Sequence, residues 1–103
     1  MDDVLKQAID RYGKTLQTFV AIEEMSELIK ELTKNMRGND NHEAMVEEIA
    51  DVYIMLDQIQ IMNGIDLNEV VTKMHEKLER LKERLEHESV QINSSLSAAS
   101  ESD

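Results

Sequence analysis

The chain has 103 residues, no Cys, no Pro, three Gly and a formal net charge of -11 at pH 7. This length suits one small domain with a modest core, which association with other copies would extend. The lack of Cys excludes disulfide frameworks and thiolate metal sites, and it suits a reducing, cytoplasmic setting. No apolar run reaches the ~18 residues of a membrane span. The net negative charge disfavours binding to nucleic acid or to anionic membranes.

Apolar residues recur at helical spacing along most of the chain and predict an all-α fold. The four predicted helices cover about residues 3–12, 15–37, 41–63 and 67–88. Glycine, which commonly follows the end of a helix, falls at each of the three junctions, as Gly13, Gly38 and Gly64. Two capping boxes, at 40–43 and 66–69, precede the third and fourth helices. Residues 1–88 are therefore predicted to form a four-helix bundle.

The composition changes after residue 88, because six of the fifteen residues 89–103 are Ser and the apolar period stops. Residues 89–103 are therefore predicted to be a disordered, Ser-rich tail.

The third predicted helix carries more apolar residues than one core face requires. Its predicted core stripe consists of Met45, Ile49, Val52, Leu56 and Ile59. Further apolar residues lie outside that stripe, namely Ile54, Met55, Ile61 and Met62. A helix that is apolar nearly all round is buried on more than one side. In so small a domain the extra cover is expected from another subunit, so we expect a homo-oligomer.

The fourth predicted helix has apolar residues at alternating spacings of four and three, from Leu67 through Leu78 to Leu85. This heptad spacing suits a long partner helix. It equally suits one more helix of the bundle.

Two pairs of acids carry the strongest functional signal. Glu24 with Glu27, and Glu48 with Asp51, are each three residues apart, so both members of a pair share one side of a helix. If the two helices fold back antiparallel around Gly38, four carboxylates converge. Two like charges ~6 Å apart repel by roughly 3 kcal/mol at an effective dielectric of ~20. Such a cluster needs a bound cation or raised pKa values, and carboxylate ligands suit Mg²⁺, Mn²⁺ or Ca²⁺.

The alternative for these acids is a pair of solvated faces. Met55 and Met62 share the face of Glu48 and Asp51, which a solvated face would not be expected to carry. The fourth predicted helix also carries a basic line, formed by Lys73, Lys77, Arg80 and Arg84. We interpret Lys77 and Arg84 as surface charges, and Lys73 and Arg80 as candidate phosphate ligands, because a nucleotide site needs cations for the outer phosphates.

With the acids placed, the chain resembles the MazG-like, all-α nucleoside triphosphate pyrophosphohydrolases. The signature of that family is Glu-Glu-x-x-Glu, a gap of some twenty residues, and Glu-x-x-Asp. It is met here by Glu23-Glu24-x-x-Glu27 and by Glu48-x-x-Asp51. The last helix of the family often reads Lys-x-x-x-Asn-x-x-Arg. Lys73 and Arg80 fit that pattern, whereas Lys77 stands in place of the Asn.

The resemblance implies that Mg²⁺, or Mn²⁺ in its place, is bound by Glu24, Glu27, Glu48 and Asp51, with Glu23 as the catalytic residue that supports the site or its water. It implies hydrolysis of nucleoside triphosphates between the α- and β-phosphates, and a homodimer or homotetramer. Gln17, Lys73 and Arg80 are the implied substrate-binding residues. Two alternatives remain open: phosphoribosyl-ATP pyrophosphohydrolase, which shares the acid pattern, and a non-enzymatic helical adaptor that uses the seam of the fourth helix.

Overall fold

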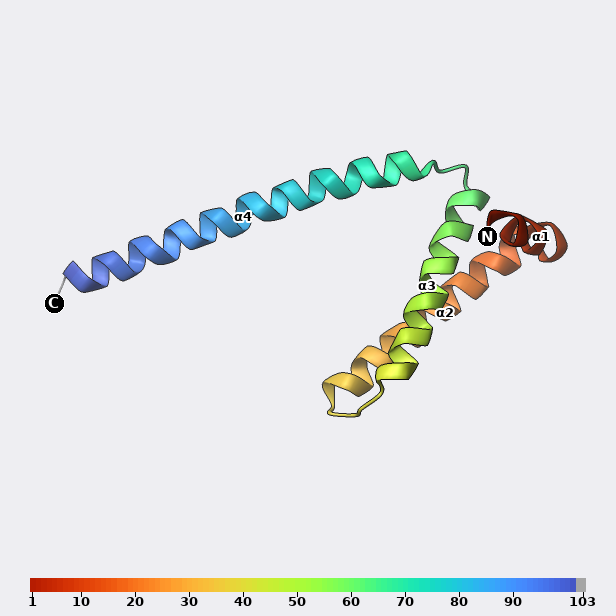
Figure 1. The fold of residues 1–103 in the computed structure, drawn as a ribbon, viewed down its shortest axis with the longest axis horizontal. Coiled ribbons are helices and arrows are strands. Elements are labelled where there is room, and N and C mark those ends of the chain that lie inside the picture. The colour runs from red at the N-terminus through yellow and green to blue at the C-terminus, as the bar shows by residue number, and fades with distance from the viewer. Residues whose placement is uncertain (102–103) are drawn as a thin grey trace. The chain divides into compact units, whose positions relative to one another are not determined.

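The computed structural model describes the backbone of residues 1–101 and the side chains of residues 1–97. This part of the chain contains four α-helices and no strand (Figure 1). In chain order they are α1 (Asp2–Tyr12), α2 (Lys14–Met36), α3 (His42–Met62) and α4 (Leu67–Glu101). The all-α prediction is confirmed, and α1 to α3 begin and end within one residue of the predicted bounds. None of the described helices combines the length and the apolar character needed to span a membrane.

The chain divides into two compact units, Met1–Asp66 and Leu67–Asp103. In the first unit, α2 and α3 lie side by side as an antiparallel hairpin, and α1 packs against both of them (Figure 1). Gly38 has φ of 96° in the turn between α2 and α3, and Gly13 has φ of 87° between α1 and α2. Because L side chains rarely adopt such angles, glycine is what lets the chain change direction within so few residues.

The fully buried side chains of α2 and α3 are mostly polar, whereas the predicted apolar stripe of α3 is half-buried at Met45, Val52 and Ile59. Ala21 is the buried apolar residue of this hairpin, and the buried side chains beside it are Gln17 on α2 and Gln58 on α3. The large apolar residues of α3 predicted for the core lie partly outside, since Ile49 and Leu56 are exposed. The predicted stripe is therefore correct in part: Ile49 and Leu56 lie on the exposed side of α3, and its other members are half-buried.

The other side of α3 carries what we term the outer apolar stripe: Val46, Ile49, Tyr53 and Leu56, all exposed. Their spacings of three, four and three residues place them on one side of the helix. Helix α2 also exposes large apolar side chains, among them Phe19, Ile22 and Ile29. One copy of the chain therefore leaves much of its apolar surface in contact with water.

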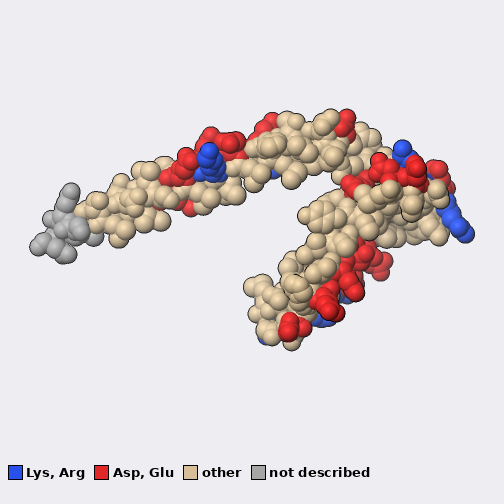
Figure 2. Space-filling model, in the orientation of Figure 1, with Lys and Arg blue, Asp and Glu red and all other residues tan. Residues whose placement is uncertain are grey.

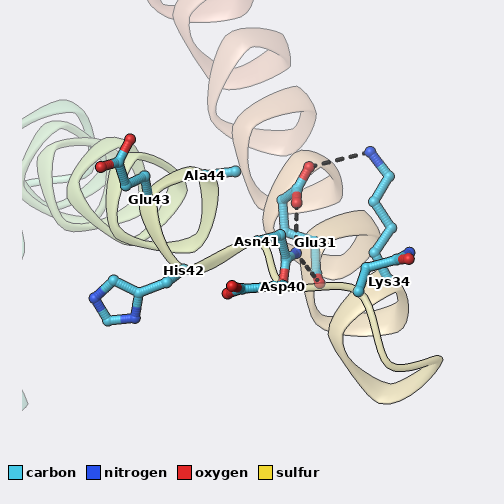
Figure 3. Close-up of a pocket in the computed structure, with 8 residues that line it drawn as sticks. Glu31, Lys34, Asp40, Asn41, His42, Glu43 and Ala44 are labelled. Carbon is cyan, nitrogen blue, oxygen red and sulfur yellow. Dashed lines mark hydrogen bonds and ion pairs between the residues drawn. The ribbon is translucent and has the colours of Figure 1, made fainter.

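A side-chain clamp closes the turn of the hairpin (Figure 3). Asn41 Nδ2 donates to the backbone oxygen of Glu31 at 2.8 Å and to Glu31 Oε2 at 2.6 Å. Lys34 Nζ lies 3.2 Å from Glu31 Oε1. The hydrogen bond from Asn41, followed by the one from Lys34, lowers the pKa of Glu31. These interactions tie the start of α3 to the last turns of α2.

The clamp replaces the predicted capping box at the start of α3. Asn41 occupies the N-cap position of α3, yet its side chain makes no capping hydrogen bond in the described structure and bonds to α2 instead. A bond across the turn satisfies two acceptors of Glu31, including a carboxylate, which outweighs one local cap.

In the computed structure, residues 89–101, which the sequence analysis assigned to a disordered tail, continue α4 to Glu101. Residues 102 and 103 lie outside the described residues. After Gly64 the chain contains neither Gly nor Pro, so no residue interrupts the helix once it has formed. Adding one residue to an existing helix is far easier than starting one, and Ser and Ala both allow that extension.

We predict that Asn41→Ala destabilises the hairpin. Loss of the bond to the Glu31 backbone costs about 1 kcal/mol, or ~4–8 °C in Tm for a domain of 60–100 residues. Asn39→Ala, in the same turn and exposed, is the matched control in thermal unfolding.

The loss caused by Asn41→Ala should also depend on pH. Because the folded pKa of Glu31 is lowered, its contribution to stability is present above the ordinary pKa of Glu and is lost as the pH falls through the folded value. The Tm difference between wild type and Asn41→Ala is therefore largest at neutral pH and shrinks in acid. An equal difference at all pH values would contradict the clamp.

Candidate metal centre

Three of the predicted acids meet between α2 and α3. Glu24 on α2 and Glu48 and Asp51 on α3 each place one carboxylate oxygen within 4.8 Å of the others. All three side chains are partly buried. Helix α2 brings Glu24 to this side because it lies seven residues, close to two helical turns, after the buried Gln17. Figure 2 shows Asp and Glu side chains gathered along the α2–α3 hairpin.

The electrostatics of the cluster are unfavourable when all three groups are ionised. Partial burial, the charge of Asp51 and a hydrogen bond with the Asp51 carboxyl raise the pKa of Glu24, and Glu48 and Glu23 add to the shift. Partial burial and the nearby charge of Asp51, with smaller contributions from Glu27 and Glu31, raise the pKa of Glu48. A cation at this point would relieve the repulsion that both shifts report.

The donor set fits a hard divalent cation. Among residues 1–97, Glu48 Oε2 and Gln58 Oε1 are buried side-chain oxygens without a hydrogen-bond partner. An orphaned carboxylate oxygen inside a cluster of carboxylates is available as a ligand. Opposite ligands of Mg²⁺ lie about 4.2 Å apart, and those of the larger Ca²⁺ lie about 5 Å apart. A spread of up to 4.8 Å therefore needs only a small side-chain adjustment to close on Mg²⁺ or Mn²⁺.

Two of the predicted acids lie outside this cluster. Glu27 Oε1 pairs with Lys30 Nζ at 3.1 Å on the exposed side of α2, although its charge still contributes to the raised pKa of Glu48. Glu23 is exposed, and its charge contributes to the raised pKa of Glu24. The structure thus brings together three of the four predicted metal ligands and leaves Glu27 beside them.

The predicted substrate-binding residues lie in different surroundings. Gln17 is buried, and its Oε1 accepts a hydrogen bond from Gln58 Nε2. Lys73 and Arg80 lie on α4, in the second unit, where Lys73 Nζ is 3.1 Å from Glu76 Oε2.

Gln58 was missed by the sequence analysis, which treated the α3 face around it as core. The spacing of the glutamines from the acids could have identified it: Gln58 follows Asp51 by seven residues on α3, just as Gln17 precedes Glu24 by seven residues on α2.

The profile of the MazG nucleotide pyrophosphohydrolase domain matches residues 13–86. The chain belongs to this family. Comparison with curated proteins and with solved structures finds no match. The matched segment begins at Gly13 and contains all three clustered acids together with Lys73 and Arg80. The MazG family match ends before residues 87–101, the last part of α4 that the structure describes.

We predict that Mg²⁺ and Mn²⁺ stabilise this MazG domain through Glu48. Ligand at 100 times its Kd adds about 2.7 kcal/mol to the folded state, so millimolar metal should raise the Tm of the wild type by several degrees. Glu48→Gln should abolish that rise. Glu47→Gln, the same change at the adjacent exposed position, should retain it. An equal metal response in both variants would argue against the site.

The metal-free cluster should also leave a signature in the dependence of stability on pH. Because the folded pKa of Glu24 is raised, the stability linked to its protonated form is present below the ordinary pKa and is lost as the pH rises through the raised value. Glu24→Gln removes this loss. In EDTA, the variant should therefore melt above the wild type at about pH 8 and close to it at about pH 4. A lower Tm for Glu24→Gln at pH 8 would contradict the assignment.

Proposed function

We propose that this chain is a Mg²⁺-dependent nucleoside triphosphate pyrophosphohydrolase. It hydrolyses ribo- or deoxyribonucleoside triphosphates between the α- and β-phosphates, giving the nucleoside monophosphate and pyrophosphate. The observation that supports this proposal most directly is the convergence of Glu24, Glu48 and Asp51 within a segment that matches the family. A cluster of carboxylates alone would support cation binding; the family match supplies the class of reaction.

In this proposal Glu24, Glu48 and Asp51 bind the metal, and Glu27 completes the ligand set by leaving Lys30. When bound, Mg²⁺ or Mn²⁺ supplies Lewis acidity and neutralises charge on the phosphates. Glu23 is exposed beside the cluster, where its carboxylate accepts the proton of the attacking water. The water oxygen forms the new bond to the α-phosphorus, and the pyrophosphate oxygen leaves.

The resemblance to the family assigns the substrate contacts of the proposal to Gln17, Lys73 and Arg80. Lys73 and Arg80 bind the outer phosphates, for which a guanidinium and an ammonium are suitable donors. Gln17 contacts the nucleoside through its amide nitrogen, while its Oε1 keeps the hydrogen bond from Gln58 Nε2. Lys77, at the position where the family often has Asn, is a surface charge in this proposal.

We further propose that the chain works as a homo-oligomer, a homodimer or a homotetramer. The outer apolar stripe of α3 supports this, because Tyr53 alone is 69 % exposed in one copy. Leu5 and Ala21 are the apolar side chains that residues 1–97 bury, which is a small core for a stable domain. A second copy seated on the stripe would supply the missing burial.

The activity is tested by following pyrophosphate release from each NTP and dNTP with Mg²⁺. The wild type should turn over at least one of them, and Glu24→Ala should lower kcat more than ~100-fold, since loss of a second-shell partner alone costs up to about that much. Pyrophosphate release from phosphoribosyl-ATP alone would favour the alternative that the chain is a phosphoribosyl-ATP pyrophosphohydrolase. No release from any nucleotide would overturn the proposal.

The phosphate role of α4 is tested separately. Lys73→Ala and Arg80→Ala should each raise KM by about tenfold, the equivalent of one charge-assisted hydrogen bond of ~1.4 kcal/mol. Lys82→Ala, an equally exposed cation of α4, is the control and should leave KM unchanged. Equal effects of all three substitutions would indicate a general field effect.

The oligomer is tested by light scattering coupled to size exclusion. Tyr53→Glu should lower the measured mass to that of one chain, because a charge at the centre of the outer apolar stripe cannot be buried without a partner. Glu43→Gln, on α3 outside the stripe, should keep the wild-type mass. A monomeric wild type would exclude the homo-oligomer.

A further inference from the structure

The contact between α2 and α3 holds a buried pair of amides beside the carboxylate cluster. Gln58 is 1 % exposed and Gln17 is 7 % exposed, and Gln58 Nε2 donates to Gln17 Oε1. Gln58 Oε1 is buried without a hydrogen-bond partner. Burying an amide with an unsatisfied oxygen reduces stability. The pair therefore reduces the stability of this contact relative to a fully satisfied one.

The amide pair and the carboxylates are related by a simple register. Seven residues along α2 lead from Gln17 to Glu24, and seven residues back along α3 lead from Gln58 to Asp51. Because the helices are antiparallel and rise ~1.5 Å per residue, the two pairs are separated by the same ~10 Å on both helices. A register that joins Gln17 to Gln58 therefore also sets Glu24 opposite Asp51.

The rest of the contact does little to fix that register. The carboxylates repel one another. Ala21 is the one fully buried apolar side chain in the described part of α2 and α3, and their other apolar residues are half-buried or exposed. The Asn41 clamp restrains the turn, at the far end of α3 from Gln58. A buried polar pair in a helix contact is the kind of feature that selects one register over its neighbours, at a cost in stability.

We propose that Gln58 is a positioning residue, which acts through Gln17 to hold α3 in the one register against α2 that assembles Glu24, Glu48 and Asp51. The inference rests on the proposed function, because it assigns Gln58 to the same metal centre. Gln58 itself does not touch the metal or the reacting phosphates.

The test compares wild type, Gln17→Leu/Gln58→Leu and Gln60→Leu by Mn²⁺ binding, followed by electron paramagnetic resonance, and by thermal unfolding in EDTA. The double variant replaces both amides with apolar groups, so it should melt at or above the wild-type Tm. Its Mn²⁺ affinity should nevertheless fall about tenfold or more. Gln60→Leu is the matched control on α3, since Gln60 Nε2 bonds to Leu56 O of its own helix at 3.0 Å. Its affinity should equal that of the wild type.

The register of α3 against α2 can also be measured without metal, as a distance between two spin labels. The chain has no Cys, so Thr18→Cys on α2 and Glu43→Cys on α3, both exposed, accept one spin label each. Dilution with unlabelled protein isolates the distance within one copy. The wild-type background should give one narrow distance distribution. The Gln17→Leu/Gln58→Leu background should give a broadened or shifted one.

The outcomes separate the two proposals. If the wild type binds no Mn²⁺, the metal centre and the proposed function fail, and the positioning role fails with them. If the wild type binds Mn²⁺ and the double variant binds it equally, with an unchanged distance distribution, only the role of Gln58 is overturned. Weaker binding by a double variant that is as stable as the wild type supports positioning, because a merely structural role would not change affinity alone.

Discussion

The structure depends on a contact between like charges, because acidic side chains of α2 and α3 face each other inside the hairpin. Glu24 and Asp51 lie close enough to share a hydrogen bond, and Glu48 Oε2 is buried without a partner. Like charges at such separations repel one another when all of them are ionised. Without a counter-charge, such a cluster is relieved either by protonation of a carboxylate or by binding of a cation. The raised pKa values of Glu24 and Glu48 show that protonation is favoured there when no cation is bound.

The amides and carboxylates take up part of the contact between α2 and α3, and apolar residues such as Val52 and Met55 are only half-buried. Other large apolar side chains of α3 face outward, as Val46, Tyr53 and Leu56 do. The proposed metal centre and the proposed homo-oligomer therefore draw on the same hairpin: the acids lie between its helices and the exposed apolar residues lie on its outer side.

The sequence predicted the helices well because local signals determine them. Gly13 and Gly38 mark junctions, and apolar periodicity between them is strong. The convergence of Glu24 with Glu48 and Asp51 followed from antiparallel packing. What periodicity could not decide is which face meets which helix, so Ile49 and Leu56 were placed in the core and Gln58 was overlooked. The Asn41 clamp was missed because tertiary geometry decides whether a side chain caps its own helix or bonds across the turn. The continuation of α4 was missed because Ser content alone does not stop a helix.

The acids can converge only if the two helices cannot slide. Apolar contacts are non-directional, so side chains of similar size distinguish neighbouring registers less sharply than hydrogen bonds do. Hydrogen bonds tolerate them poorly: a shift of one residue moves a group ~1.5 Å along the axis and turns it by ~100°. The hairpin has such bonds toward both ends, Gln17 with Gln58 and Glu31 with Asn41, and the carboxylates lie between them. Repulsion among the acids favours opening the hairpin, and these two polar pairs oppose it. The polar pairs thus contribute less stability than an apolar contact would, but they align the acids of α2 with those of α3. The proposed metal centre requires that alignment, because its ligands come from separate helices.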